Sequence, residues 1–416
     1  MREGWKISTL GELCKFENGD RGKNYPGRKA FVPSGIPFIN AGHLDDGKID
    51  WQGMDFIPQN RYDLLGNGKV QKFDLLFCLR GSLGKFGFVD RDIEGAIASS
   101  LVIVRPSEQL ECDFLAAYFR SALCAEMISK YANGAAQPNL SAKSLKEFQI
   151  PFPPIPEQKR IVAILDEAFA GIDTAIANTE KNLANARELF ESYLLSAFEN
   201  KDENWEVKKW GDLCQFVRGP FGGSLKKSMF KDQGYAVYEQ KHAIHDHFNQ
   251  LRYFIDENKF KEMKRFEVKS GDIIMSCSGV TLGRVAIIPD NIPRGIINQA
   301  LLKLTPNKLI SVHFLKYWLR SKIFQDIIFK HSGGAAIPNV PSAKILKEIV
   351  IPLPCLKEQE QIVNSIEMLL TETKRLHAIY QQKLNSLKEL KQSLLQKAFS
   401  GELTAEADKL IDEAVA

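Results

Sequence analysis

The sequence predicts an α+β protein with two similar β-rich domains that also contain helices. Two long antiparallel helices separate the domains and form an intramolecular coiled coil with a pseudo-two-fold axis. Two observations predict this fold: the chain repeats one order of landmarks after about 200 residues, and each repeat ends in a long proline-free run of helix formers. The expected segments are a first domain over 1–153, a proline entry and spacer helix over 154–200, a second domain over 201–354, and a second proline entry, spacer helix and tail over 355–416.

Each helical run begins at a proline-rich entry. The entries start at Pro151 and Pro352, and both continue through Glu-Gln to Ile-Val. Proline favours an extended backbone in the segment before the helix. It is also tolerated in the first helical turn, where its missing N–H is not needed. Apolar residues then recur at heptad spacing over 165–197 and 366–394. Each run would be roughly 60 Å long at about 1.5 Å per residue. The two stripes most simply bury each other, and the alternative is that each packs separately on its own domain.

The first domain begins at Trp5 and continues into a loop rich in Gly, Lys and Arg. Short strand-like segments follow, and an amphipathic helix is expected from Phe114 to about Tyr131. The strand-like segments lie at 36–40, 74–85 and 100–106, and the loop 133–140 leads to the proline entry.

The second domain repeats these landmarks. Trp205 lies 200 positions after Trp5, and Gly334-Ala335-Ala336 repeats Gly134-Ala135-Ala136. Residues 24–68, in contrast, share almost nothing with 224–266. A repeated scaffold with different loops suits a long, roughly two-fold ligand whose two halves differ, and duplex DNA is the obvious candidate.

The bulk composition is that of an ordinary globular protein. The 55 basic and 51 acidic residues leave a net charge of +4, so any basic surface must be local. The seven cysteines form no C-x-x-C pair, which favours a reducing compartment. No apolar signal core and no 18-residue apolar run occur, so we expect a cytoplasmic protein without a membrane contact.

The chain resembles the specificity subunits of type I restriction–modification systems over essentially its whole length. The residues that carry the resemblance are the two proline entries, Asp272-Ile273-Ile274, and the closing segment 397–403, Lys-Ala-Phe-Ser-Gly-Glu-Leu. One departure is Cys355-Leu356-Lys357, where the family usually has a third proline. The resemblance implies two target-recognition domains that each read half of a split site in double-stranded DNA, with the helices as a ruler between them.

The resemblance also implies partners. Two methyltransferase subunits would dock on the helices, and translocating restriction subunits would join them. S-adenosylmethionine, ATP and Mg²⁺ are expected in those subunits, and no cofactor is expected in this chain. Apolar residues beyond the heptad seam are the candidate docking surface, namely Ile161, Ile164, Leu189, Leu194, Ile362, Leu370, Leu384, Leu390 and Leu395.

The motifs of an enzyme are absent from the sequence. Residues 151–154 lack the Asn or Asp that precedes Pro-Pro in an adenine methyltransferase, and Glu372-Thr373-Lys374, although nuclease-like, lies inside the heptad helix. The segment 81–85 lacks the first Gly and the final Ser or Thr of a phosphate loop. His242, His245 and His247 have no partner Cys or acidic triad at metal-ligand spacing, so a polar loop is favoured over a metal site. No catalytic residue and no metal site are therefore expected.

Candidate DNA contacts are basic and amide side chains in the glycine-rich loops, because Arg and Lys suit phosphates and guanine while Asn and Gln pair with adenine. In the first domain they are Arg21, Lys23, Arg28, Lys29, Arg80, Lys85, Gln137 and Asn139. In the second they are Arg218, Lys226, Lys227, Gln240, Lys241, His242, Ser278, Arg284 and Asn339. A rival hypothesis is a two-headed coiled-coil scaffold that binds other proteins.

Overall fold

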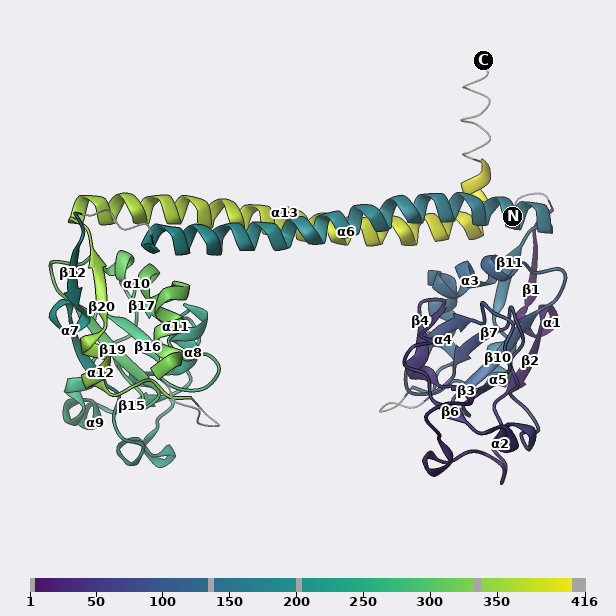
Figure 1. The fold of residues 1–416 in the computed structure, drawn as a ribbon, viewed down its shortest axis with the longest axis horizontal. Helices are drawn as coiled ribbons and strands as arrows, with labels where there is room; N and C mark the ends of the chain where they lie inside the picture. The colour runs from purple at the N-terminus through teal and green to yellow at the C-terminus, as the bar shows by residue number, and fades with distance from the viewer. Residues whose placement is uncertain (1–3, 134–137, 200–203, 332–337, 406–416) are drawn as a thin grey trace, which may run out of the picture. The chain divides into compact units, whose positions relative to one another are not determined.

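The computed structural model describes residues 4–133, 138–199, 204–331 and 338–405. The chain divides into two compact units, residues 1–179 with 382–416 and residues 180–381 (Figure 1). Each unit contains one β-rich domain and one half of each long helix. The two units repeat the same order of elements, which is the duplication that the sequence predicts.

A four-stranded antiparallel sheet forms the centre of the first domain. Its order is β2 (Cys14–Asn18), β10 (Leu101–Pro106), β7 (Leu75–Cys78) and β8 (Phe86–Phe88). Side chains alternate between the two faces of a strand. Val102 and Val104 therefore join a core shared with helices, while Leu101 and Ile103 join a separate core on the other face. Burial on both faces explains why β7 and the first four residues of β10 are continuous apolar runs.

Smaller elements complete the first domain. A second sheet contains β6 (Phe56–Ile57), β3 (Ile36–Ile39) and β9 (Ala96–Ile97), and two pairs are β4 (Leu44–Asp45) with β5 (Lys48–Ile49) and β1 (Lys6–Thr9) with β11 (Gln149–Phe152). The helices are α1 (Leu10–Leu13), α2 (Gln59–Asp63), α3 (Cys112–Arg120), α4 (Ala122–Tyr131), α5 (Ala142–Lys146), η1 (Arg28–Ala30) and η2 (Ala41–His43).

The single helix predicted over 114–131 is wrong, because Ser121 divides it into α3 and α4. Ser121 has an extended backbone with φ −80° and ψ 155°. Its hydroxyl donates to the carbonyl of Tyr118 at 2.6 Å and accepts from the N–H of Cys124 at 3.4 Å. A serine that caps a helix in this way competes with a continuous helix. In the second domain Ser321 does the same between α10 (Val312–Arg320) and α11 (Lys322–His331).

The second domain has the same plan. The order of its main sheet is β13 (Cys214–Arg218), β19 (Leu301–Pro306), β16 (Ile273–Ser276) and β17 (Val285–Ile287). The order of its small sheet is β15 (Phe254–Ile255), β14 (Tyr235–Tyr238) and β18 (Gly295–Ile297). A separate pair joins β12 (Glu206–Lys209) to β20 (Val350–Leu353). The helices are α7 (Trp210–Leu213), α8 (Gln240–His245), α9 (Glu257–Glu262), α10 (Val312–Arg320), α11 (Lys322–His331), α12 (Ala343–Glu348), η3 (Gly222–Ser224), η4 (Lys227–Met229) and η5 (Lys264–Phe266).

The structure reveals a repeat within the segments whose sequences differ most. Asp46 and Asp246 both have a left-handed backbone, with φ of 40° and 52°. His43 and His242 each accept a hydrogen bond at Nδ1 from the N–H three residues earlier, at 3.1 and 2.8 Å. The residues 24–68 and 224–266 therefore share a backbone plan that their sequences do not show.

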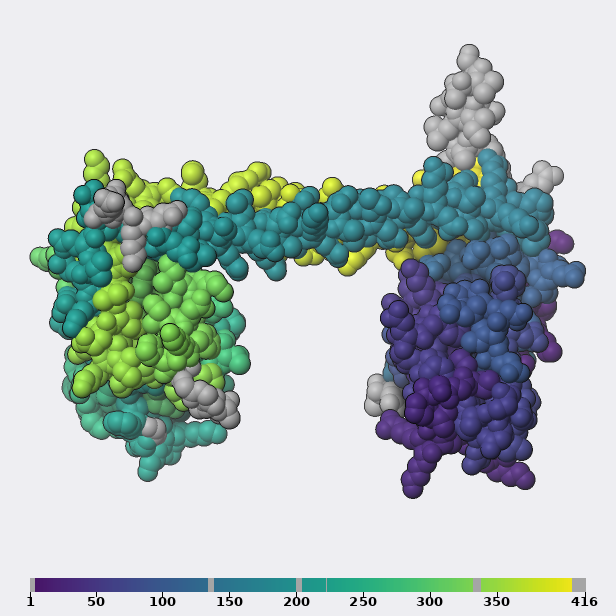
Figure 2. Space-filling model, viewed as in Figure 1, coloured from purple at the N-terminus to yellow at the C-terminus, as the bar shows by residue number. Residues whose placement is uncertain are grey.

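The two long helices, α6 (Ile155–Glu199) and α13 (Leu356–Ser400), contain 45 residues each. At about 1.5 Å per residue each is about 67 Å long. In the first unit Lys391 near the end of α13 pairs with Asp173 in the first half of α6, and in the second unit Arg187 of α6 lies 3.0 Å from His377 of α13. Within each unit the two helices lie side by side (Figures 1 and 2). The start of one helix thus lies beside the end of the other, which confirms the antiparallel pair.

The long helices also pack on the domains. The alternative expected from the sequence, in which each apolar stripe packs on its own domain, therefore contributes to the fold together with the helix pair. Ile161, Leu165, Leu395 and Phe399 belong to the main core of the first domain. The Phe399 and Phe114 rings lie 5.0 Å apart, and in the second unit Phe198 and Phe314 lie 5.4 Å apart. Among the helices that the structure describes, none combines the length and the hydrophobicity that a membrane span requires.

A buried glutamine ties each long helix to its domain and explains the Glu-Gln of the proline entries. Gln158 accepts from the N–H of Glu111 at 2.8 Å and donates to the carbonyls of Gln109 and Pro153 at 2.9 and 2.8 Å. Gln359 makes the same three hydrogen bonds with the backbone at 311, 309 and 354, at 2.7, 3.1 and 2.9 Å. Each amide thus anchors the first turn of a long helix to the segment that precedes α3 or α10.

Candidate nucleic-acid interface

The loops that carry most candidate contacts leave one edge of the main sheet in each domain. In the first domain Asn18 pairs with Val102 and Cys78 pairs with Leu101, so the ends of β2 and β7 meet the start of β10. In the second domain Arg218 pairs with Leu302 and Ser276 with Leu301. We call this side of each sheet the loop edge, and it includes the loops after β2 and β7, or β13 and β16, and the residues just before β10 or β19.

Asn139, which lies in the segment before α5, reaches the same edge. Arg80 and Asn139 form an isolated β-bridge, and Arg80 Nε donates to Asn139 Oδ1 at 3.2 Å. Arg21 donates from Nη2 to the carbonyl of Ser99 at 3.2 Å. The structure therefore brings Arg21, Arg80 and Asn139 to the loop edge. Gln137 lies outside the described residues.

The other basic candidates of the first domain are exposed but scattered. Lys23 lies in the loop after β2, and Arg28 and Lys29 belong to η1. Lys85 is exposed at the start of β8 and lines a groove beside the long helices instead. Lys85 and Arg80 belong to one loop, but Lys85 faces the groove whereas Arg80 lies beside Asn139.

In the second domain Ser278 contacts two other candidate residues, Gln240 and Asn339. Gln240 donates from Nε2 to the Ser278 carbonyl at 2.6 Å and lies 3.4 Å from the Thr281 hydroxyl. Ser278 forms a β-bridge with Asn339, in the position of the Arg80–Asn139 bridge. An amide, a hydroxyl and a second amide therefore replace the Arg–Asn pair of the first domain.

The remaining candidates of the second domain lie apart from this cluster. Arg218 is exposed at the end of β13, and Lys226 and Lys227 are exposed at η4. Lys241 is half-buried, with Nζ 3.7 Å from Glu239. Arg284, like Lys85, lines a groove beside the long helices.

His242 does not face outward, and the structure contradicts its assignment as a DNA contact. The residue is 1% exposed. Nδ1 accepts from the N–H of Glu239, which leaves Nε2 to donate to the carbonyl of Gln250 at 3.2 Å. Burial lowers the pKa of His242 below its ordinary value, although the two backbone partners oppose that shift. The side chain therefore holds the loop together as a neutral ring.

Two exposed residues at the loop edge of the second domain were missed by the sequence analysis. Gln299 is exposed just before β19, and Phe221 is exposed just before η3. A Cβ on Gly219 would lie 1.9 Å from the Asn298 carbonyl oxygen, so these two loops touch. The available signal for Gln299 was position, since it lies two residues before an apolar strand as Ser99 does in the first domain.

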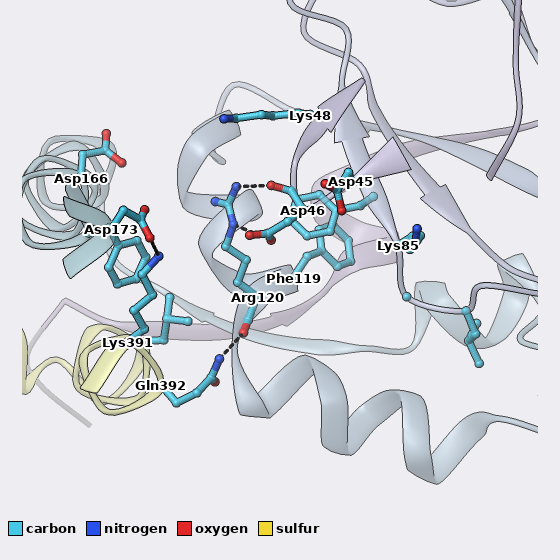
Figure 3. A pocket seen from close by; sticks show the side chains of 15 residues that line it. Asp45, Asp46, Lys48, Lys85, Phe119, Arg120, Asp166, Asp173, Lys391 and Gln392 are labelled. Carbon is cyan, nitrogen blue, oxygen red and sulfur yellow. Dashed lines mark hydrogen bonds and ion pairs between the residues drawn. The ribbon is translucent and has the colours of Figure 1, made fainter. Parts of the chain in front are cut away.

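Each domain also forms a groove against the long helices of its own unit. The groove of the first unit has a volume of about 650 Å³, and Figure 3 shows Arg120 at its centre. Arg120 contacts Asp46 from Nε at 3.0 Å and the Asp46 carbonyl from Nη2 at 2.9 Å, while Gln392 of α13 donates to the Arg120 carbonyl at 3.4 Å. These contacts join the β4–β5 turn, the end of α3 and α13.

The equivalent groove of the second unit has a volume of about 630 Å³. There Arg320 and Lys316 share one oxygen of Asp246, at 2.9 and 2.7 Å. Burial lowers the pKa of Lys316, and its pair with Asp246 opposes the shift. The described residues contain no group of three or more His, Cys, Asp or Glu placed to hold a metal ion.

The structure corrects most of the predicted docking surface on the helices. Ile161, Leu194, Leu384 and Leu395 are buried, and Ile164, Ile362 and Leu370 are half-buried against the domain cores. The prediction failed because the helix ends pack on the domains as well as on each other. Leu189 and Leu390 remain exposed, at 61% and 47%. Tyr193, Met368 and Ile379 are exposed as well.

Comparisons with known proteins agree with this architecture. The family model described as the type I restriction modification DNA specificity domain matches residues 2–185 and 202–389. The EcoKI specificity subunit of Escherichia coli K12 is 25% identical over 98% of this chain and 90% of its own length. The StySPI specificity subunit of Salmonella potsdam is 24% identical over 98% of this chain and 90% of its own length.

Two solved structures share the fold. A chain from work on complex assembly and conformational transition of the type I R-M system has a TM-score of 0.79 and 20% identity, and the match covers 97% of this chain and 99% of that one. The HsdS subunit from Thermoanaerobacter tengcongensis has a TM-score of 0.62 and 20% identity, with 97% and 98% covered. With two copies of the family domain, two loop edges and two long paired helices, the chain belongs to the type I restriction–modification DNA specificity family and is a specificity subunit.

Proposed function

We propose that this specificity subunit is a non-catalytic DNA reader that recognises a bipartite duplex site, one half with each loop edge, and positions its partner enzymes there. The observation that carries the proposal is that the two loop edges share a backbone frame but present different side chains. A guanidinium beside an amide suits guanine or adenine edges, whereas an amide beside a hydroxyl favours adenine. The two edges would therefore select different half-sites.

The partner subunits would supply the chemistry. Two methyltransferase subunits would bind S-adenosylmethionine, and restriction subunits would bind ATP and Mg²⁺. The exposed apolar residues Leu189 and Leu390 support a docking site in each unit, Leu189 in the second and Leu390 in the first. Exposed apolar patches on helices are typical of partner surfaces.

The test is an exchange of residues 201–353 for those of a relative that reads another site. Methylation mapping in a host that carries the methyltransferase should show that one half of the site changes and the other half stays. A gel shift with and without the methyltransferase should show selective binding to the mapped site. A change in both halves, or in neither, would contradict independent reading.

A further inference from the structure

The two most exposed large apolar side chains in the described part of the chain lie in the same domain. Phe221 is 93% exposed and Val280 is 91% exposed. Single exposed apolar residues are common on protein surfaces and need no explanation. Two apolar side chains that are almost fully exposed on loops at one edge of the same sheet do need an explanation.

Both side chains lie at the loop edge of the second domain. Gly219 donates its N–H to the carbonyl of Leu301 at 2.8 Å, which holds the Phe221 loop beside β19. Cys277 donates to the carbonyl of Ala300 at 2.9 Å, which holds the Val280 loop beside the same turn. Gln299 therefore directly precedes the two residues, Ala300 and Leu301, that anchor the loops.

These loops are held by backbone contacts rather than by the apolar side chains. Ser224 donates to the carbonyl of Phe221 at 2.8 Å, and Gly279 donates to the carbonyl of Pro338 at 2.9 Å. Gly279 has φ 81°, a left-handed conformation that glycine adopts easily. The frame thus presents Phe221 and Val280 outward, and neither side chain contributes buried surface to the domain.

The described residues of the first domain contain no equivalent pair at the loop edge. The position of Phe221 in the loop after β13 corresponds to Arg21 in the loop after β2, and the loop after β7 runs Arg80-Gly81-Ser82 without an apolar tip. At these positions the first domain has Arg21 and Arg80, whereas the second domain has Phe221 and a loop with Val280 at its tip. The two edges differ in the kind of base feature that they fit.

We propose that Phe221 and Val280 contact the 5-methyl groups of thymines in the half-site read by the second domain. This inference rests on the proposed function. The thymine methyl is the one apolar group on the edge of a DNA base pair, and apolar side chains contact it in the major groove. Gln299 and Gln240 beside them suit the adenine that pairs with such a thymine.

The test begins with the mapped site and the subunit in complex with its methyltransferase. Each thymine of the second half-site is replaced in turn by deoxyuridine, which removes only the methyl group. Wild-type binding should weaken about fourfold at each contacted thymine. Phe221→Ala should weaken binding to the thymine duplex about ten- to a hundredfold. Replacing the thymine that Phe221 contacts by deoxyuridine should cause no further loss of affinity in this variant.

Matched variants and outcomes make the test decisive. Leu309→Ala removes a half-exposed apolar side chain beyond the opposite end of β19, and it should leave both affinities unchanged. Phe221→Leu should keep most of the deoxyuridine effect.

Wild-type affinity that is insensitive to deoxyuridine throughout the half-site would overturn the proposal. A full deoxyuridine penalty in the Phe221→Ala, Val280→Ala double variant would also overturn it. Failure of the wild type to distinguish the mapped site from a scrambled duplex would instead contradict the proposed function.

Discussion

The two domains agree where side chains hold the backbone and differ where side chains point outward. Gln158 and Gln359 make the same three buried hydrogen bonds, and Asp46 and Asp246 occupy the same left-handed turn. At the loop edges, in contrast, an Arg–Asn pair in one domain corresponds to a Gln–Ser–Asn cluster in the other. A fixed frame with exchangeable outward side chains lets one fold read two different sequences, since DNA specificity resides in the few residues that reach base edges.

The largest expected effect concerns the docking site of each unit. Leu189→Asp and Leu390→Asp each place a charge on an apolar surface that a partner would bury, which opposes binding. Each single variant should lose one of two methyltransferase subunits, and the double variant should lose both while its domains stay folded. Light scattering after co-purification measures the mass of the complex. A double variant that still bound two subunits would show that the docking surface lies elsewhere.

The buried glutamines should be equally important in the two domains. Gln158→Met and Gln359→Met keep the side-chain volume but leave one backbone N–H and two carbonyls without partners. Each substitution should lower the free energy of unfolding of its domain by about 2–4 kcal/mol. Urea unfolding followed by tryptophan fluorescence tests this, with exposed Gln361→Met as the control. Equal unfolding free energies for Gln359→Met and Gln361→Met would contradict it.

The two grooves should respond differently to loss of their arginines. Arg120→Ala removes the side-chain partner of Asp46, whereas Arg320→Ala leaves Lys316 beside Asp246. We expect Arg120→Ala to destabilise its turn by about 1 kcal/mol and Arg320→Ala to have a smaller effect. Hydrogen exchange at 44–49 and 243–248 gives the local measurement. Combining Arg320→Ala with Lys316→Met should remove the difference, and a persistent difference would refute this explanation.

The smallest effect is a pH dependence that belongs to the second domain. Burial lowers the pKa of His242, so the unfolded chain binds a proton more readily than the folded domain. Stability is therefore complete above the unfolded value, about 6.5, and falls as the pH drops toward the folded pKa. The thermal midpoint should decrease from pH 7 to pH 5 more steeply in the wild type than in His242→Asn. Parallel curves would show that this histidine does not contribute.

Much of the architecture follows from local sequence. The duplication, the two long helices and the apolar strands were predicted because helix periodicity, strand alternation and proline entries act over a few residues. Ser121 shows the limit, since its capping role depends on whether the hydroxyl reaches the N–H of Cys124. The loop-edge residues Arg80, Asn139 and Ser278 were identified from their type and position, while the contacts among them were not.

The repeated landmarks, the proline entries and the heptad spacing were enough to predict a duplicated, two-helix specificity subunit whose two domains have different loops. Which residues of each pattern remain exposed depends on how the chain packs. Leu194 and Leu189 look alike in sequence, yet one is buried in the core of the second domain and the other is exposed. His242 looks like a surface histidine, yet packing with Phe248 and Tyr238 encloses it. Burial depends on contacts between residues far apart in the chain, and those contacts exist only once the domains have folded around the helices.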